Sequence, residues 1–326
     1  NKLREGKVIN KAEEAKTFEV DERSIQRDID DIRTYLADAA AEEGGTGLTV
    51  EYDRAKKGYY LVGDDGSMMT NEEILVVSKI LLSSRAFTKS EMNTIIKKLI
   101  AGCAPLENYK LVNDLILNEQ HHYIEPKHKT KVKEKIWELG KYIENKEVLE
   151  ISYKRHINVM DEVKRTIIPV SIMFSDYYFY LNAYILEKNE NQSGANKYKK
   201  AFDYPAIFRV DRIKRCKPLN EKYIIKYSDR FEEGLYRKRI QFMFAGELVK
   251  VRLKVHERAL EATLDRLPTA RVILEKKDAN IVEAEVYGDG IIMWVLSQGE
   301  KVEIIYPEKL REKIKGKIES MWERYK

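Results

Sequence analysis

The sequence predicts an α+β protein of several domains, because three different patterns of apolar residues follow one another along its 326 residues. Up to about residue 145, apolar residues recur every three or four positions, which is typical of helices. Between residues 147 and 219, β-branched and aromatic residues form short runs typical of strands. From about residue 240, strand-like and helix-like segments alternate. A chain of this length exceeds the usual size of one core, so we expect separate domains.

Composition limits the class of protein. Hydrophobic residues make up 43% of the chain, which is ordinary for a soluble protein, and the net charge of +5 permits nucleic-acid binding without arguing strongly for it. The two cysteines, Cys103 and Cys216, are far apart and suit a reducing compartment. No apolar run approaches the roughly 20 residues that span a bilayer, and no secretory signal is visible. We therefore expect a cytoplasmic protein without a membrane partner.

A helix with two contrasting faces is predicted over residues 22–36. Four apolar residues recur at steps of four, three and four, and we expect them to be buried: Ile25, Ile29, Ile32 and Leu36. Asp21 precedes them as the expected N-cap. The opposite face carries long polar side chains, namely Arg23, Gln26, Arg27, Asp30 and Arg33.

A shorter helix and a hairpin flank this segment. Residues 5–18 form the shorter helix, and a tight turn through Glu19 and Val20 follows it. Residues 48–62, LTVEYDRAKKGYYLV, are typical of two strands about a basic turn. Helix, turn, helix and basic-tipped hairpin is the order of a winged helix-turn-helix, so we assign residues 1–65 as a DNA-binding domain.

Two interpretations of the polar helix face are open, since most charged helix faces are simply solvated. The basic hairpin downstream favours DNA contact, because Arg and Gln can pair with base edges and Arg and Lys bind phosphates. Residues 1–65 carry 11 Lys and Arg against 16 Asp and Glu, which is unusual for such a head. We therefore expect few contacts and a modest salt dependence. The predicted DNA-binding residues are Arg23, Ser24, Gln26, Arg27, Arg54, Lys56 and Lys57.

The helical region over residues 66–145 is predicted to act as a linker and dimerisation region. Thr70, followed three residues later by Glu73, is typical of a capping box at a helix start. Long helices beside a DNA-binding head commonly build dimers. On that ground we expect a homodimer.

Two further domains are predicted beyond the helices. Residues 146–225 contain several short strands and a polar loop without a long helix, which predicts a small antiparallel barrel. Residues 240–326 follow the order βαββαβ of the ferredoxin-like fold, with one helix after it. The final helix has an apolar face that we expect to dock on the sheet or on a neighbour: Leu310, Ile314, Ile318, Met321 and Tyr325.

Three stretches of sequence resemble parts of one protein family. VDERSIQRDIDDIR with GLTVEYDRAKKGYYLVG resembles its winged head, and PVSIMFSDYYFYLNAYIL with FRVDRIKRCKPL resembles its barrel. The βαββαβ segment resembles its C-terminal extension. The chain thus resembles the bacterial WYL-domain transcriptional regulators along nearly its whole length, which implies an Sm-like barrel for residues 146–225.

The chain departs from the family pattern at three places. The Trp-Tyr-Leu motif stands here as Phe179, Tyr180 and Leu181. Glu19 occupies a turn where Gly is usual, and at positive φ it would cost about 1 kcal/mol. Most of the first helix of the winged fold is missing, so we expect that further residues precede Asn1 in the natural protein.

The predicted barrel contains a second candidate site. The resemblance implies that this domain senses a nucleotide or single-stranded nucleic acid, for which Arg can bind phosphate and Tyr can stack on a base. The alternative is a set of ordinary ion pairs with Tyr180 in the core. Arg209 and Arg212 match the family's arginine pair best, and we expect Asp211 on the other face of the strand. The predicted effector-binding residues are Tyr153, Arg155, His156, Arg165, Tyr180, Arg209 and Arg212.

We expect no enzyme, because no nucleophile elbow, Walker motif or metal-ligand spacing is present. His121 and His122, with Glu125 and His128 nearby, lack the convergent spacing of a metal site, and no cofactor is expected. The sequence therefore predicts a sequence-specific regulator that binds a double-stranded operator and an effector. The alternative is an accessory factor that binds a polymerase or a defence complex without an effector.

Overall fold

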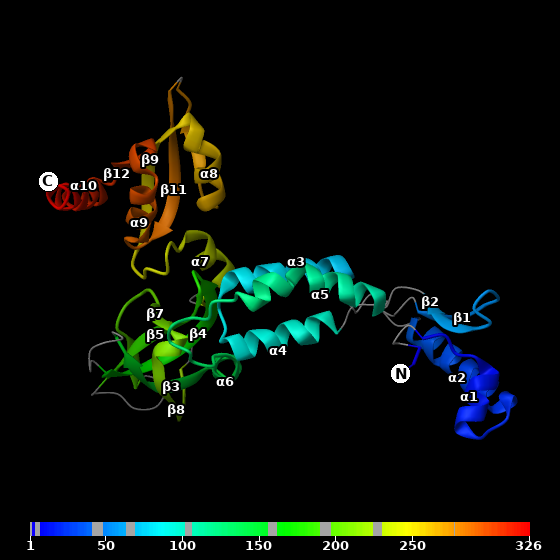
Figure 1. Cartoon of the computed structure of the whole chain (residues 1–326). Coiled ribbons are helices and arrows are strands. Elements are labelled where there is room, and N and C mark those ends of the chain that lie inside the picture. The colour runs from blue at the N-terminus through cyan, green and yellow to red at the C-terminus, as the bar shows by residue number, and fades with distance from the viewer. Residues whose placement is uncertain are drawn as a thin grey trace. The chain divides into compact units, whose positions relative to one another are not determined.

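The computed structural model describes residues 2–3, 7–40, 48–62, 69–101, 106–155, 162–189, 197–223, 230–276 and 278–326. These residues form a mixed α/β structure with ten α-helices and three antiparallel sheets (Figure 1). The contacts divide the chain into two compact units, Asn1–Lys129 and Thr130–Lys326. Within the described residues, none of the helices has the length and apolar character needed to cross a membrane.

The first unit begins with α1 (Lys11–Phe18), α2 (Glu22–Ala40) and a hairpin of β1 (Thr49–Asp53) and β2 (Gly58–Val62). Ile25, Ile29 and Leu36 are buried in a core with Val50 of the hairpin, as their spacing predicts. The expected burial of Ile32 is wrong, because this side chain is 39% exposed. It shares the apolar face of α2, but the described residues do not cover that turn of the helix.

The turn between α1 and α2 contains a residue in the left-handed region. Glu19 has φ 57° and ψ 39° and forms the C-cap of α1. The conformation that would make Glu19 unfavourable is therefore present. Asp21 then starts α2 as predicted, because its Oδ1 accepts a hydrogen bond of 2.6 Å from the backbone N–H of Ser24. This bond lowers the pKa of the Asp21 carboxyl.

The backbone of the hairpin is fixed at both ends of its turn. Ile9 and Tyr59 exchange two backbone hydrogen bonds, of 2.7 and 2.8 Å. Gly58 permits this approach, since a Cβ there would lie 2.8 Å from the carbonyl oxygen of Ile9. The Asp53 carboxylate accepts two backbone N–H bonds from the turn, of 2.7 and 3.1 Å. The turn itself exposes the predicted basic residues Arg54, Lys56 and Lys57.

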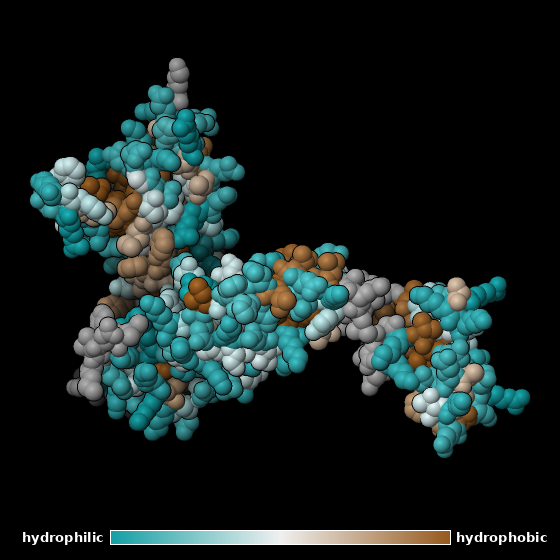
Figure 2. Space-filling view, in the orientation of Figure 1, coloured by the Kyte–Doolittle hydropathy of each residue, from teal (hydrophilic) through white to brown (hydrophobic). Residues whose placement is uncertain are grey.

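Three helices complete the first unit: α3 (Asn71–Ser84), α4 (Lys89–Ile100) and α5 (Leu106–His121). They share a buried core that includes Ile74, Met92 and Ile116. The predicted capping box of Thr70 and Glu73 is present at the start of α3. α3 and α5 also expose apolar side chains, which form the hydrophobic area over these helices in Figure 2. We call this area the α3–α5 patch, and its members are Val76, Ile80, Leu111 and Leu115.

The second unit begins with α6 (Lys133–Glu144). The sequence pattern assigns this helix to the helical region over residues 66–145, whereas its contacts place it with the sheet that follows. Leu139 of α6 is buried in the core of the sheet that follows. The strands of that sheet are β3 (Glu147–Lys154), β4 (Glu162–Ser175), β5 (Tyr178–Lys188), β6 (Tyr198–Lys200), β7 (Ala206–Arg209) and β8 (Ile213–Lys222). Their order is β6-β5-β4-β3-β8, and β7 pairs with β5.

The connection between β7 and β8 makes this sheet curl. β7 pairs with β5, whereas β8 pairs with β3. A 3-10 turn, Val210–Arg212, is all that separates the two strands in the chain. Three residues span at most about 10 Å, so β5 and β3 have to approach each other around the core. Ile151, Leu181 and Ile213 are fully buried there.

The C-terminal part has the predicted βαββαβ order. After α7 (Glu233–Arg239) come β9 (Leu248–His256), α8 (Leu260–Arg266), β10 (Arg271–Leu274), β11 (Ala279–Tyr287), α9 (Gly290–Ser297), β12 (Val302–Tyr306) and α10 (Glu308–Glu323). The antiparallel sheet has the order β10-β11-β9-β12, and α8 and α9 contribute to its core. Leu310 and Ile314 of α10 also join this core. The rest of the predicted apolar face is exposed, namely Ile318 and Met321 in α10 and Tyr325 beyond its end.

Replacing Glu19 by glycine should stabilise the pair α1–α2. Glycine adopts positive φ without a steric cost, so we expect the free energy of opening to rise by about 0.5–1 kcal/mol in Glu19→Gly. Hydrogen exchange of the α1 and α2 amides in the full chain measures this change. Glu19→Ala is the matched control, because alanine keeps the Cβ. An equal gain in both variants would contradict the explanation by backbone conformation.

Candidate nucleic-acid and effector sites

Gln26, a predicted DNA contact on α2, is held within the first unit. Its Oε1 accepts hydrogen bonds from the Tyr59 hydroxyl at 2.8 Å and from Lys11 Nζ at 3.0 Å. Its Nε2 donates to the Asp30 carboxylate at 3.1 Å. Gln26 therefore connects α1, α2 and the hairpin. It could contact a base only by giving up these bonds.

Arg23 and Arg27 have a different environment on the same helix. Both side chains are exposed, and among the residues that the structure describes neither guanidinium makes a hydrogen bond or an ion pair. Ser24 is half-buried in the first turn, where its N–H is bonded to Asp21. Arg23 and Arg27 are thus the members of the predicted set on α2 that are available to a ligand.

The hairpin tip presents basic side chains on a fixed backbone. Lys57 has φ 49°, and its carbonyl oxygen accepts a hydrogen bond of 3.2 Å from the Asn10 side chain. Lys56 Nζ lies 5.4 Å from the centroid of the Tyr60 ring. Arg54, Lys56 and Lys57 are all exposed. Such an arrangement suits phosphate contacts, which need charge and position rather than base-edge geometry.

Arg209 is the centre of the predicted effector site in the second unit. Its Nε and Nη2 donate to the two carboxylate oxygens of Asp211 at 3.1 and 2.9 Å. The guanidinium also lies 3.4 Å from the centroid of the Tyr178 ring. The two charged side chains are only 14% and 5% exposed. Burial opposes the charged form of Arg209, but Asp211, Tyr178 and Tyr180 together raise its pKa overall.

The expectation that Asp211 lies on the face opposite Arg209 is wrong. It assumed a continuous strand, whereas Val210–Arg212 is a 3-10 turn. This turn brings the Asp211 carboxylate back to the Arg209 guanidinium. The charge of Arg209 is therefore compensated, and an anion that binds there has to compete with a buried carboxylate.

Other predicted effector residues lie around Arg209. The Tyr153 hydroxyl accepts a hydrogen bond of 3.3 Å from the Arg209 backbone N–H, and Tyr180 lies opposite Arg209 in the β5–β7 register. Arg212 Nη1 donates to the carbonyl oxygen of Arg155 at 2.8 Å. The buried Nε of Arg212 has no hydrogen-bond partner in the described part of the chain. An unpaired buried donor is a candidate contact for a ligand oxygen.

Two predicted residues are not placed in this group. Arg165 is on β4, where it lies opposite Ile151 of β3. Its Nη1 donates a hydrogen bond of 3.0 Å to the carbonyl oxygen of Lys164. His156 lies outside the described residues. Tyr178, in contrast, contacts Arg209 and was not predicted. The alternation of a strand could have identified it, because residues two apart share a face and Tyr180 was already a candidate.

Removing Arg209 alone should destabilise the curled sheet. In Arg209→Ala the Asp211 carboxylate stays buried without its partner, so we expect the free energy of unfolding of the second unit to fall by about 3 kcal/mol. The double variant Arg209→Ala/Asp211→Ala should recover much of this loss. Urea unfolding followed by tryptophan fluorescence measures both, since Trp137, Trp294 and Trp322 lie in the second unit. If the free energy of unfolding falls equally in the single and the double variant, Arg209 and Asp211 are not energetically coupled.

Comparisons with known proteins agree with the C-terminal architecture. Residues 247–322 match the family model of the WCX domain, and these residues run from β9 into α10. No curated protein matches the chain. Two solved structures are similar to it.

The first is proteasome accessory factor B/C (PafBC) of Arthrobacter aurescens, with 16% identity and a TM-score of 0.31 over 94% of this chain and 44% of that one. The chain thus spans less than half the length of that protein. The second, described as a CRISPR Cas-related protein, has 14% identity and a TM-score of 0.36 over 77% of this chain and 72% of that one. Residues 247–322 are thus a WCX domain, a domain that is associated with WYL domains.

Proposed function

We propose that this chain is a sequence-specific DNA-binding transcriptional regulator that responds to a nucleotide or single-stranded nucleic acid. The WYL-associated WCX domain at residues 247–322 supports a regulator-like function. The observation that carries the DNA-binding part is the exposed, unpaired Arg23 and Arg27 on α2, followed by a hairpin with three exposed basic residues at its tip. The proposal includes neither a catalytic step nor a cofactor.

The proposal gives each part of the chain a fold and a role. α1, α2 and the hairpin would form a winged helix-turn-helix, and the curled sheet β3–β8 an Sm-like barrel. The sheet β10-β11-β9-β12 with its two helices would be a ferredoxin-like domain. Support comes from topology: the short β7–β8 turn suits closure of a barrel, and the C-terminal strands follow the βαββαβ order.

Arg23 and Arg27 are the residues proposed to enter the major groove, where Arg can bind base edges bidentately. Arg54, Lys56 and Lys57 would bind phosphates or the minor groove from the hairpin. Gln26 would position α2 through its bonds to Tyr59 and Lys11. Because residues 1–65 carry more acidic than basic residues, non-specific attraction to DNA should be weak.

The effector is proposed to bind at Arg209 and Arg212. A phosphate could take the place of the Asp211 carboxylate on Arg209 and accept the unpaired Arg212 Nε–H. Arg209 precedes the 3-10 turn that joins β7 to β8, and Arg212 is the last residue of that turn. Replacement of the Asp211 carboxylate by a ligand phosphate on Arg209 would therefore change the contacts of the turn between β7 and β8, which curls the sheet. This is allostery only if the effector favours one arrangement of the protein over another.

The α3–α5 patch favours a protein interaction as well. Ile80 is 63% exposed and Leu111 60% exposed, in a unit whose other apolar side chains supply a buried core. Contiguous exposed apolar side chains commonly mark an interface. We assign this patch to a homodimer. In the alternative function, an accessory factor would use it to bind a partner protein, and no effector would be needed.

Arg27→Ala should weaken operator binding and leave the response to single strands unchanged. Fluorescence anisotropy measures both quantities with DNA fragments from upstream of the protein's own gene. The titrations run over a salt series, with and without short single-stranded DNA and RNA. Three phosphate contacts per head, and thus six in a dimer, predict a slope of log K against log salt of about −5. Arg27→Ala should leave that slope nearly unchanged and weaken binding to the operator more than binding to unrelated DNA, whereas Arg324→Ala at the end of α10 is the control.

The double variant Arg209→Ala/Asp211→Ala should show the reverse behaviour, with operator binding kept and the response to the single strand lost. Unchanged operator binding in Arg27→Ala would exclude the proposed face of α2. Tight binding that no single strand or nucleotide affects would leave the regulator without the proposed effector. Absence of any sequence preference at low salt would favour the accessory factor.

Ile80→Glu should shift the protein from dimer to monomer, because a carboxylate on the α3–α5 patch would have to be buried in the interface. Sedimentation velocity over a concentration series measures the dissociation constant, which we expect to rise at least about tenfold. Ile318→Glu on α10 is the matched control, since this isoleucine is also exposed. Dissociation in the control alone would place the interface on α10.

A further inference from the structure

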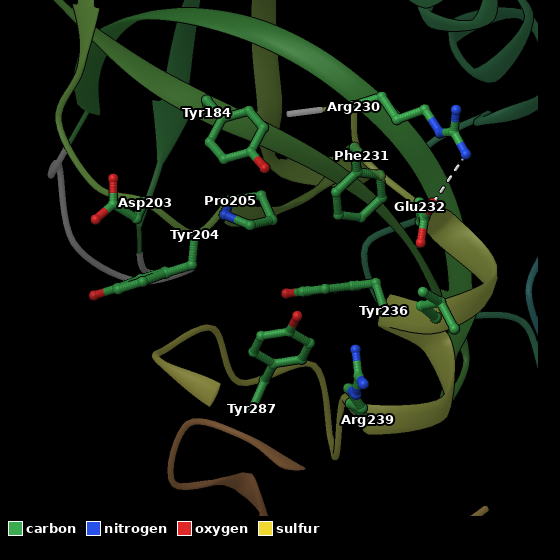
Figure 3. A pocket seen from close by; sticks show the side chains of 11 residues that line it. Tyr184, Asp203, Tyr204, Pro205, Arg230, Phe231, Glu232, Tyr236, Arg239 and Tyr287 are labelled. Carbon is green, nitrogen blue, oxygen red and sulfur yellow. Dashed lines mark hydrogen bonds and ion pairs between the residues drawn. The ribbon is translucent and has the colours of Figure 1, made fainter. Parts of the chain in front are cut away.

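The second unit contains a cavity of about 410 Å³ that none of the predicted effector residues lines (Figure 3). Its walls come from three parts of the unit: β5 and the segment before β7, α7 with the residues that precede it, and the end of β11. Five aromatic side chains line it: Tyr184, Tyr204, Phe231, Tyr236 and Tyr287. The volume is in the range of small-molecule sites.

The aromatic rings are held by contacts with one another. Tyr204 stacks on Phe202 with 5.5 Å between ring centroids. Tyr236 packs against Tyr287 at 4.8 Å and against Phe231 at 5.0 Å. In Figure 3, Tyr184, Tyr204, Tyr236 and Tyr287 lie around a common space. A flat aromatic guest would gain stacking there without a large rearrangement of the walls.

The hydroxyl of Tyr236 gives an independent reason to expect a ligand. The residue is only 3% exposed, and in the described structure its buried hydroxyl has no hydrogen-bond partner. Figure 3 shows this hydroxyl directed into the space between Tyr204 and Tyr287. Burial raises the pKa of Tyr236, so the group stays protonated and can donate. Buried hydroxyls are normally paired, and a polar ligand edge in the cavity would supply the partner.

The charges around the cavity argue against a phosphate inside it. The Arg230 guanidinium pairs with Glu232 at 3.2 Å, and the Arg239 guanidinium pairs with Glu285 at 2.8 Å. Asp203 adds a further carboxylate to the lining. The two lining cations are thus compensated by carboxylates. An uncharged ring with polar edges fits this lining better than an anion does.

We propose that this cavity binds a nucleoside, with the base among the tyrosine rings and a polar edge of the base on the Tyr236 hydroxyl. A base offers flat faces for stacking and donors and acceptors at its edge. The choice of a nucleoside as the ligand rests on the proposed function. The base of the effector would then bind at a site apart from Arg209. Phosphates of the same class of ligand would stay outside the cavity.

The position of the cavity gives binding a consequence. Its walls belong to β5, to α7 and to the end of β11, and Ile240 after α7 forms a β-bridge with Tyr287. A bound base would contact all three parts at once. The ligand would therefore stabilise their native arrangement relative to any state in which they separate.

The test measures nucleoside binding to the full chain by saturation-transfer NMR, with adenosine, guanosine, cytidine and thymidine as probes. Tyr236→Phe should weaken binding roughly three- to tenfold, the effect of one lost hydrogen bond. The midpoint of thermal unfolding of this variant should stay level or rise, because an unpaired buried hydroxyl is gone. Tyr204→Leu should weaken binding about tenfold through lost stacking. Tyr142→Phe on α6 is the control, because its hydroxyl bonds Glu138 at 2.8 Å and does not line the cavity.

The outcomes separate this inference from the proposed function. Failure of all four nucleosides to bind, or equal binding to wild type, Tyr236→Phe and Tyr204→Leu, overturns the inference. If Tyr236→Phe binds normally while Arg209→Ala/Asp211→Ala loses its response to single strands, the effector proposal stands and the cavity proposal falls. If nucleoside binding is weakened in Tyr236→Phe while no single strand changes operator binding, the cavity proposal stands and the effector proposal falls.

Discussion

The short connection between β7 and β8 is the constraint on which the second unit depends. Three residues, Val210–Arg212, lead from a strand paired with β5 to a strand paired with β3. The same three residues fix the Asp211 carboxylate on Arg209 and place Arg212 beside the carbonyl of Arg155. At the residue that follows the turn, the carbonyl oxygen of Ile213 accepts a hydrogen bond of 2.7 Å from Lys135 Nζ of α6. Curvature of the sheet and position of the candidate effector residues thus have one cause.

Compensation of charge decides which polar groups are available to ligands. Arg209 is a candidate by sequence resemblance, yet its guanidinium is already bound by Asp211 and packed on Tyr178. Arg23 and Arg27 are ordinary in sequence, yet within the described residues their guanidinium groups make neither a hydrogen bond nor an ion pair. A residue type therefore indicates what a side chain could bind, whereas its intramolecular partners determine what binding would have to displace.

Periodicity predicted the elements well, because it depends on neighbours within one helix or strand. It located α2, the burial of Ile25 and Ile29, and the βαββαβ order of the C-terminal part. It failed for Ile32, whose exposure depends on what covers that turn from elsewhere in the fold. It also placed Asp211 on the wrong face, since a 3-10 turn breaks the alternation of a strand. The tyrosines of the cavity come from separate segments, so no local pattern connects them.

The excess of acidic residues over residues 1–65 imposes a physical requirement on the proposed DNA binding. With 11 basic and 16 acidic residues over residues 1–65, long-range attraction to phosphates cannot supply much affinity. Affinity then has to come from a few close contacts, and doubling those contacts in a dimer raises it by effective concentration rather than by charge. The α3–α5 patch lies in the same compact unit as the head. Dimerisation through this patch would tie two heads together, and weak individual heads favour selectivity because non-specific DNA holds them poorly.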